Sequence, residues 1–412
     1  MNVKSFIKIV FYIFIIFSFL FLTSNKVIGP FCMRHICAVG LFIYYLFSSK
    51  KIKFDYIEKL YFLYLTTYII CNVLNGEIMT SSFLTRFVSY HFSDIVLICS
   101  IPIIINKKED FNLFIVALLL IYVSNSLLTI AQFFSIPFSW EIGQMVNDGL
   151  SRELDANEAI FNDDMGLIGR TITAGFTGFV VTNGYFTTCY LPIAHQAIKI
   201  KNNVFLLLFL IIIALTASFV NQERSAFFLV LAYFLIYLFL YKGISKVFFL
   251  FFCIVLIILF LNVDFSQFEL GRFAEFSDRS RNTLWKDFYD FLGTDRALFG
   301  GENNYVSLYK VNQHNCLTAA WTIGGIFTFL TFSILYFSAA LVLTRLIVNR
   351  VFIESNAIAF SLAFSCMLYL IYSLTHSSGL HNDGVMFWLP YTLLLKYKKI
   401  FKKNYNENHF DF

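Results

Sequence analysis

The sequence is poor in charge. Only 14% of its 412 residues are Asp, Glu, Lys or Arg, whereas 58% are hydrophobic. Soluble domains carry roughly a quarter charged residues, so this shortage excludes the ordinary soluble class and indicates a polytopic membrane protein. The formal net charge of +5 is small for the length and indicates no nucleic-acid-binding surface.

Three further absences narrow the class. The eight cysteines lack metal-ligand spacing and lie mostly in apolar runs, so we expect small buried side chains rather than a metal site. No small-residue cleavage site follows the apolar run near the N-terminus, which we interpret as a first transmembrane helix. No internal repeat like those of many transporters is evident, and we expect no soluble domain at either end.

Long apolar runs dominate what is present. Their lengths predict an all-α polytopic membrane protein with about twelve transmembrane helices. The runs lie near 6–23, 30–48, 57–74, 83–105, 111–134, 173–196, 204–220, 225–241, 247–263, 318–343, 356–375 and 385–396. Arg86, His91 and Asp94 interrupt the fourth run, and because lipid penalises charge we expect them to face the bundle interior, as site residues or as a structural network.

Basic residues collect on one side of the predicted topology. If the spans alternate, the following fall on that side: Lys50, Lys51 and Lys53; Lys107 and Lys108; Lys199 and Lys201; Lys242 and Lys246; Arg345 and Arg350; and Lys396 to Lys403. The positive-inside rule makes this side the cytoplasm, with both termini in it. The chain 1–412 is therefore expected to form one transmembrane domain, with a large outer loop at 264–317 and a second at 136–172.

The 264–317 loop combines charge with many aromatic side chains, so we expect it to fold against the membrane domain. Residues 280–291 have the spacing of a short amphipathic helix, with Arg281 in its first turn. Gly300 and Gly301 predict a turn, and His314 precedes the tenth span. A lone histidine is more often a hydrogen-bonding residue than a catalyst, but this one lies beside an arginine-bearing loop.

Basic residues on the outer side are mostly arginines: Arg152, Arg170, Arg224, Arg272, Arg279, Arg281 and Arg296. A guanidinium makes paired hydrogen bonds to phosphate, which favours an anionic phosphate-bearing ligand on that face. Paired surface charge is the alternative, because the long loop holds slightly more acidic than basic residues. Arg224, in a hairpin of only a few residues, is expected to begin the next helix at the membrane surface, as a snorkelling anchor or a site residue.

In the last outer turn, His376, His381 and Asp383 either line an acceptor path or belong to a solvated turn.

Four patches between Arg170 and Gly325 occur in a definite order. They are Arg170 with Gly175, Phe176 and Asn183; Gln222-Glu223-Arg224-Ser225-Ala226; Ser280-Arg281-x-x-x-Trp285 with Leu298-Phe299-Gly300-Gly301; and His314-Asn315-x-Leu317 with Gly324-Gly325. In this order they resemble the O-antigen polymerase and ligase superfamily of bacterial inner-membrane glycosyltransferases. Glu223, Thr182 and the lack of a glycine after Ser225 depart from the family pattern. The first 165 residues contribute only compatible hydropathy.

The resemblance implies a glycosyltransferase-C-like fold and an undecaprenyl-pyrophosphate-linked glycan as donor and as acceptor. It implies an O-antigen polymerase of lipopolysaccharide biosynthesis in the bacterial inner membrane, needing no metal or other cofactor. Partners would be membrane lipid, a chain-length regulator and a flippase, but no nucleic acid. The implied catalytic residues are His314, as general base or acceptor-positioning group, and Arg224 and Arg281, which stabilise the leaving pyrophosphate. The implied substrate-binding residues are Arg170, Arg279, Glu223, Trp285 and Asn315.

Other functions fit the same motifs. An O-antigen ligase would transfer the finished glycan to the lipid A core, and a protein O-glycan transferase is a third member of the superfamily. From a different class, a lipid-linked oligosaccharide flippase or transporter would also need many spans. Transporters place charged sites near the membrane midplane, whereas polar residues here gather on the outer side, which favours an enzyme.

Overall fold

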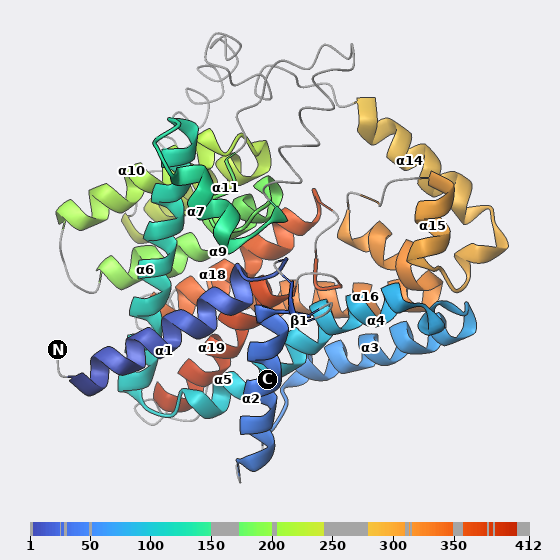
Figure 1. Cartoon of the computed structure of the whole chain (residues 1–412), viewed down its shortest axis with the longest axis horizontal. Coiled ribbons are helices and arrows are strands. Elements are labelled where there is room, and N and C mark those ends of the chain that lie inside the picture. The colour runs from blue at the N-terminus through green and yellow to red at the C-terminus, as the bar shows by residue number, and fades with distance from the viewer. Residues whose placement is uncertain are drawn as a thin grey trace. The chain divides into compact units, whose positions relative to one another are not determined.

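The computed structural model describes residues 3–24, 26–28, 31–48, 52–149, 173–199, 204–242, 279–309, 313, 315–348, 357–376, 379–381 and 384–401. In these ranges the regular structure is helical, apart from a short antiparallel pair formed by β1 (Lys26–Ile28) and β2 (Phe31–Cys32). Figure 1 shows this helical architecture. The predicted all-α class is confirmed.

Among the described residues, five helical stretches are long and apolar enough to cross a membrane. They are α1 (Val3–Leu20), α3 (Tyr56–Leu74), the stretch Ser81–Ile104, α6 (Lys108–Phe133) and α16 (Cys316–Val348). Shorter apolar helices include α2 (Met33–Phe47), α10 (Val204–Val220), α11 (Arg224–Lys242) and α18 (Ala357–Ser373). The chain thus has the character of a membrane protein, while the count of twelve spans and their sidedness stay predictions.

Each expected span that falls on described residues coincides with a helix, and the ninth, 247–263, lies outside them. One boundary was wrong. Helix α9 (Val180–Lys199) begins well after the expected start at residue 173. The preceding segment contains Gly175 and Gly178 at φ values of 55° and 76°, which a right-handed helix does not accommodate.

The chain divides into two compact units, residues 1–119 with 278–412 (unit 1) and residues 120–277 (unit 2). In unit 1, α16 packs along α3, α18 packs on α19 (Val385–Phe401), and α5 (Ser93–Ile104) contacts α2 and α19 (Figure 1). In unit 2, α9 contacts both α10 and α11. The second half of α6 and the short helix α7 (Ser139–Val146) also belong to unit 2.

The fourth expected span is an α-helix interrupted by a π turn. It consists of α4 (Ser81–Phe87), the π turn η2 (Val88–Phe92) and α5. A π turn inside a helix is uncommon and often marks a functional segment. His91 lies in this turn and is 1% exposed.

Local sequence signals explain two important helix starts. Asp55 and Glu58 form a reciprocal capping box at the start of α3, each side chain accepting from the other residue's backbone N–H at 2.8 Å. Asn315 caps α16, because its Oδ1 accepts from the backbone N–H of Leu317 at 2.9 Å. The turn after α3 leads through Gly76 into η1 (Glu77–Met79).

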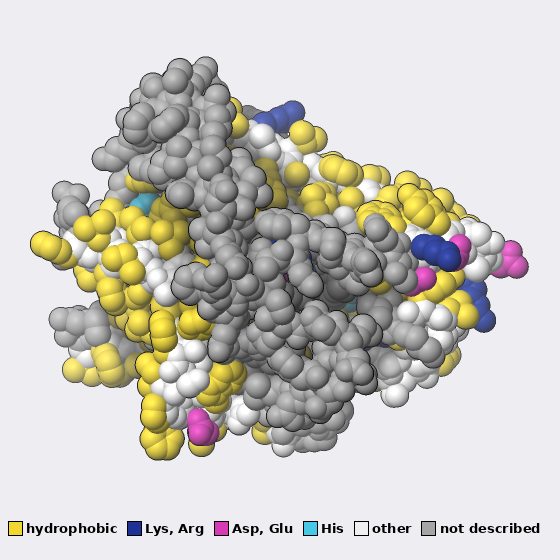
Figure 2. Space-filling view, turned by 90° about the horizontal axis from the view of Figure 1, so that it is seen from above, with side chains coloured by type: hydrophobic (Ala, Val, Ile, Leu, Met, Phe, Trp, Pro, Cys, Tyr) yellow, Lys and Arg dark blue, Asp and Glu magenta, His cyan; other side chains and the backbone are white. Residues whose placement is uncertain are grey.

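The long loop supplies the helices nearest to the predicted site. They are α14 (Arg279–Leu292), the 3-10 turn η4 (Asp295–Ala297) and α15 (Glu302–Tyr309), all in unit 1. In the face shown in Figure 2, most described side chains are hydrophobic, and charged ones gather mainly at the end where α14 and α15 lie. Seven cysteines are described, of which all but Cys37 are buried, as expected from the sequence.

Candidate functional site

The loop after α14 lies directly on the backbone of α16. The N–H of Gly301 donates to the carbonyl of Thr322 at 2.9 Å, and the N–H of Ile326 donates to the carbonyl of Leu298 at 3.2 Å. Helix α16 breaks at this point, where Gly325 has a φ of 72°. The break frees backbone groups that the loop then satisfies.

Two pairs of glycines permit this approach. A Cβ on Gly300 would lie 2.3 Å from the backbone nitrogen of Gly325. A Cβ on Gly325 would lie 2.2 Å from the carbonyl oxygen of Leu298. Both distances are far below van der Waals contact, so only glycine fits at either position. The third and fourth sequence patches are thereby in contact with each other; we call this contact the glycine clamp.

Arg86 joins the start of α15 to the turn between α3 and α4. Its guanidinium lies 2.8 Å from Glu302 Oε2 and 3.3 Å from Glu77 Oε2. Glu77 Oε1 also accepts from the backbone N–H of Asn304 at 3.1 Å. Burial raises the pKa of the Glu77 carboxyl above its usual range, although Arg86 opposes that shift. The positive charge of Arg86 therefore offsets the repulsion between the carboxylates of Glu77 and Glu302.

We expect Arg86→Met to lower the melting temperature, with a loss of about 2 kcal/mol, intermediate between surface and buried ion pairs. The loss should grow as pH rises. A carboxyl whose folded-state pKa is raised favours folding below its unfolded pKa, near 4.5, and loses that contribution as pH rises through the folded value. Without Arg86 the pKa of Glu77 rises further.

Thermal melts in detergent at pH 4.5 and pH 7 measure this effect. The gap between wild type and Arg86→Met should be larger at pH 7, and Arg86→Met/Glu77→Gln should narrow it. Arg296, an exposed arginine in the loop that carries Glu302, supplies the control Arg296→Met. Equal gaps at the two pH values would contradict the proposed coupling to Glu77.

Helix α14 is amphipathic, as predicted. Phe288 and Phe291 are buried on one side, whereas Trp285 is 43% exposed. Gln313 fixes the helix, since its Nε2 donates to the carbonyl of Leu284 at 2.7 Å. Arg281 lies in the first turn, as expected, which places its backbone one turn from Leu284.

Both the oxygen and the nitrogen of the Asn315 side-chain amide form hydrogen bonds. Besides capping α16 through Oδ1, it donates from Nδ2 to the carbonyl of Leu374 at 2.9 Å, near the end of α18. This arrangement favours a structural role for Asn315 over the predicted substrate contact. It also fixes the backbone directly after His314, which itself lies outside the described residues.

In unit 2, Asn183 is the centre of a buried amide network. Its Oδ1 accepts from Asn125 Nδ2 at 2.8 Å, and its Nδ2 lies 3.0 Å from Thr129 Oγ1 and 3.0 Å from Asn221 Oδ1. Asn125 lies in α6 and Asn221 lies in the turn directly after α10, so the network joins α6, α9 and the end of α10. All three asparagines are fully buried.

The same network supports the non-helical segment before α9. Gln132 Oε1 accepts from the backbone N–H groups of Ala174 at 3.0 Å and Gly175 at 2.8 Å. Asn125 Oδ1 accepts from the N–H of Phe176 at 2.8 Å. Side chains of α6 thus replace the helical hydrogen bonds that this segment lacks.

The hairpin between α10 and α11 is buried within the protein, and its expected position at the membrane surface stays a prediction. Asn221 and Gln222 are 0% exposed and Glu223 is 4% exposed. Its tight geometry places Gln222 at a φ of 57°, and Asn221 Nδ2 donates to the carbonyl of Val180 at 3.1 Å. Arg224 is half-buried and begins α11, which confirms the predicted helix start.

Asn183→Leu should destabilise the protein by about 3 kcal/mol, because it leaves the buried amides of Asn125 and Asn221 without their shared partner. The neighbouring residue Thr182 is half-buried and outside the network, so Thr182→Leu is the matched control. We expect a melting temperature several degrees lower for Asn183→Leu than for Thr182→Leu. Equal melting of the two variants would show that the network adds nothing to stability.

A second buried polar cluster lies in unit 1. The hydroxyl of Tyr61 donates to Asp94 Oδ2 at 3.0 Å and lies 3.2 Å from His91 Nδ1. The expectation that Arg86, His91 and Asp94 face the interior is confirmed, since His91 and Asp94 are buried and Arg86 forms internal ion pairs. Sequence reasoning missed Tyr61, which falls in an aromatic-rich run without distinguishing neighbours. The interpretation that His381 belongs to a solvated turn is wrong, because its side chain is only 3% exposed.

The predicted site residues divide between the two units. Glu223 and Arg224 lie in unit 2, and the backbones of Arg279 and Arg281 lie in unit 1 with Trp285 and Asn315. Arg170 and His314 fall outside the described residues, as does most of the 136–172 loop. The structure joins Asn183 of the first patch to Asn221, the residue directly before the second patch, and it joins the third patch to the fourth. A site shared by Arg224 and Arg281 stays a prediction.

Within the described ranges, no group of three or more His, Cys, Asp or Glu side chains is arranged to hold a metal ion. The charged groups gathered around Arg86 are one guanidinium and two carboxylates, which form ion pairs. Comparison with protein-family models gave no match, and a search of curated proteins gave none.

Proposed function

We propose that the chain is a membrane glycosyltransferase of the O-antigen polymerase type. It joins undecaprenyl-pyrophosphate-linked repeat units at the outer face of the inner membrane, with both termini in the cytoplasm. One observation carries the proposal. Segments that carry the patches and are distant in sequence meet in pairs, Asn183 with Asn221 next to the second patch in unit 2, and Gly300 with Gly325 in unit 1. Segments that together form a site must be held in this way.

The chemistry requires a group that stabilises the leaving pyrophosphate. Arg224 at the start of α11 and Arg281 in the first turn of α14 are the proposed cations. Each belongs to a helix N-terminus, where backbone N–H groups and the helix dipole also favour anions. Paired guanidinium hydrogen bonds to phosphate oxygens supply this stabilisation without a metal.

The acceptor supplies a hydroxyl that attacks the anomeric carbon of the donor sugar. A new glycosidic C–O bond forms while the bond to the pyrophosphate oxygen breaks, and the leaving pyrophosphate keeps the electron pair. His314 takes the hydroxyl proton, or positions the hydroxyl, and the attack from the opposite side inverts the anomeric centre. Glu223, Trp285, Arg170 and Arg279 contact or orient the glycan and its phosphates.

Deletion of the gene followed by analysis of the lipopolysaccharide tests the function. A polymerase defect leaves one repeat unit on each core, and complementation restores the ladder of long chains. Uncapped core, with long glycan retained on the lipid carrier, would identify a ligase instead. Repeat units trapped on the cytoplasmic leaflet would identify a flippase.

His314→Ala should abolish long chains in the complementation experiment, with protein abundance unchanged. An imidazole that removes a proton typically contributes about a hundredfold or more to the rate. Gel profiles of the lipopolysaccharide, normalised to the protein detected in membranes, measure this. Chains of wild-type length and yield would exclude His314 from the reaction.

A further inference from the structure

Unit 1 contains a cavity of about 630 Å³ between α1 and α2, closed by the end of α5 and the start of α6. Its wall is mostly aliphatic and aromatic: Phe11, Tyr12, Phe14, Ile15, Met33, Ile36, Cys37, Gly40, Leu41, Tyr44 and Ile104. The cavity is independent of the predicted glycosyltransferase residues, since none of them lines it. It therefore calls for a ligand of its own.

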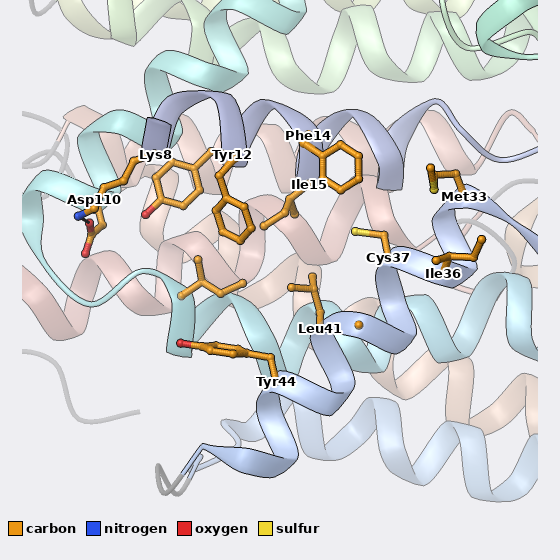
Figure 3. Close-up of a pocket in the computed structure, with 13 residues that line it drawn as sticks. Lys8, Tyr12, Phe14, Ile15, Met33, Ile36, Cys37, Leu41, Tyr44 and Asp110 are labelled. Carbon is orange, nitrogen blue, oxygen red and sulfur yellow. Dashed lines mark hydrogen bonds and ion pairs between the residues drawn. The ribbon is translucent and has the colours of Figure 1, made fainter. Parts of the chain in front are cut away.

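The cavity is polar at one end only. Lys8 Nζ and Asp110 Oδ1 form an ion pair of 2.5 Å there, and Figure 3 shows this pair at one end of the row of side chains, with Met33 and Ile36 at the other. The Lys8 side chain is 33% exposed, so it remains accessible to a ligand. A charged end joined to an apolar length is the shape of a lipid site.

The charge around the polar end is positive. Lys4 lies one turn before Lys8 on α1, and Lys107 and Lys108 lie just before Asp110; these three lysines are exposed. With Lys8 they outnumber the nearby carboxylates of Glu109 and Asp110. Basic pockets between transmembrane helices on the cytoplasmic side suit anionic lipid head groups. The predicted topology places this end on that side.

We infer that this cavity binds one anionic glycerophospholipid of the surrounding bilayer. One acyl chain occupies the apolar part, and the phosphate lies at the lysine end. An acyl chain that leaves the bilayer gains no hydrophobic transfer energy, so the apolar wall contributes van der Waals packing and the lysines supply the selectivity. A protein helix is about 10 Å across, which suits a space between two neighbouring helices less well than a flexible chain does.

Gly40 offers a clean way to close the cavity. It lines the wall, and a Cβ added to it meets no atom within 4 Å. The Cβ of Gly40→Leu should therefore meet no clash, the rest of its side chain should enter the space, and leucine also favours the helix. Val39, next in sequence and 47% exposed, provides the matched control Val39→Leu.

Native mass spectrometry and thermal melts of the detergent-purified chain test the inference, with phosphatidylglycerol and phosphatidylcholine as probes. For wild type and Val39→Leu we expect one tightly held phosphatidylglycerol and a melting temperature that rises with its concentration. Gly40→Leu should bind no phosphatidylglycerol, and its melting temperature should not rise with the lipid concentration. Without added lipid, its melting temperature should be no lower than that of wild type. Changing the exposed Lys4, Lys107 and Lys108 to Gln should cut the preference for phosphatidylglycerol at least about tenfold.

Two results would overturn the inference. One is equal lipid retention by Gly40→Leu and Val39→Leu, which would place the lipid elsewhere. The other is equal binding of phosphatidylglycerol and phosphatidylcholine by the wild type, which would remove the selectivity for anionic lipid. If Gly40→Leu melts below wild type before lipid is added, Gly40→Ala takes its place in the experiment. This variant adds one methyl group to the same space and should weaken lipid retention partially.

Discussion

Gly325→Ala is expected to release the loop after α14 from α16 and to abolish the proposed glycosyl transfer. Two costs combine at this position. The backbone has a φ of 72° and a ψ of −172°, a conformation that is essentially restricted to glycine. In addition, the new Cβ would lie 2.2 Å from the carbonyl oxygen of Leu298. We expect a loss of about 3 kcal/mol or more, taken up by opening of the glycine clamp.

Limited proteolysis and thermal melts measure the release directly. Cleavage between α14 and α16 should become faster in Gly325→Ala, and the melting temperature should fall. The control is Gly293→Ala in the same loop, where an added Cβ has only Asp290 O at 3.4 Å. That change should stay within about 0.5 kcal/mol of wild type. Wild-type resistance to protease in Gly325→Ala would contradict the assigned clamp.

The second large effect concerns charge geometry. Arg224→Lys and Arg281→Lys should each reduce polymer formation by about a hundredfold to a thousandfold, the range seen when one preorganised donor is removed from an active site. Lysine keeps the positive charge but makes no paired hydrogen bonds to a phosphate group. A contribution from charge alone would survive the substitution.

Reconstituted protein with a lipid-linked repeat unit, or complementation of the deletion strain, provides the measurement. Arg296→Lys, an exposed arginine of the same loop, is the control and should retain full activity. Melting temperatures of the lysine variants should stay near wild type. Full activity in Arg281→Lys or in Arg224→Lys would remove that arginine from pyrophosphate stabilisation.

Helix positions were predictable because apolar run length carries most of the information in a membrane protein. The amphipathic helix at α14 was predictable for a related reason, since apolar residues recur at helical spacing; of these, Phe288 and Phe291 are buried, whereas Trp285 is 43% exposed. The start of α11 at Arg224 followed from the shortness of the hairpin. These features depend on residues close together in the sequence.

The contacts that organise the candidate site were not predictable in the same way. Asn125, Asn183 and Asn221 are single polar residues in three separate apolar segments, and nothing local indicates that their amides meet. The burial of the hairpin follows from that meeting. Arg86 was expected to face inward, but its pairing with Glu302 joins residues that are far apart in the sequence. Its other partner, Glu77, is only nine residues away. Long-range pairing of this kind requires coordinates.

The glycine break in α16 also determines how that helix matches a bilayer. At 33 residues the whole helix is about 50 Å long, well beyond the roughly 30 Å of a hydrocarbon core. The part after the break, residues 326–348, is about 35 Å long and suits a bilayer with modest tilt. We therefore expect the first part, beginning at Cys316, to extend past the lipid on the side of the loop. We also expect the break that lets the loop approach to lie near the level at which the lipid phase ends.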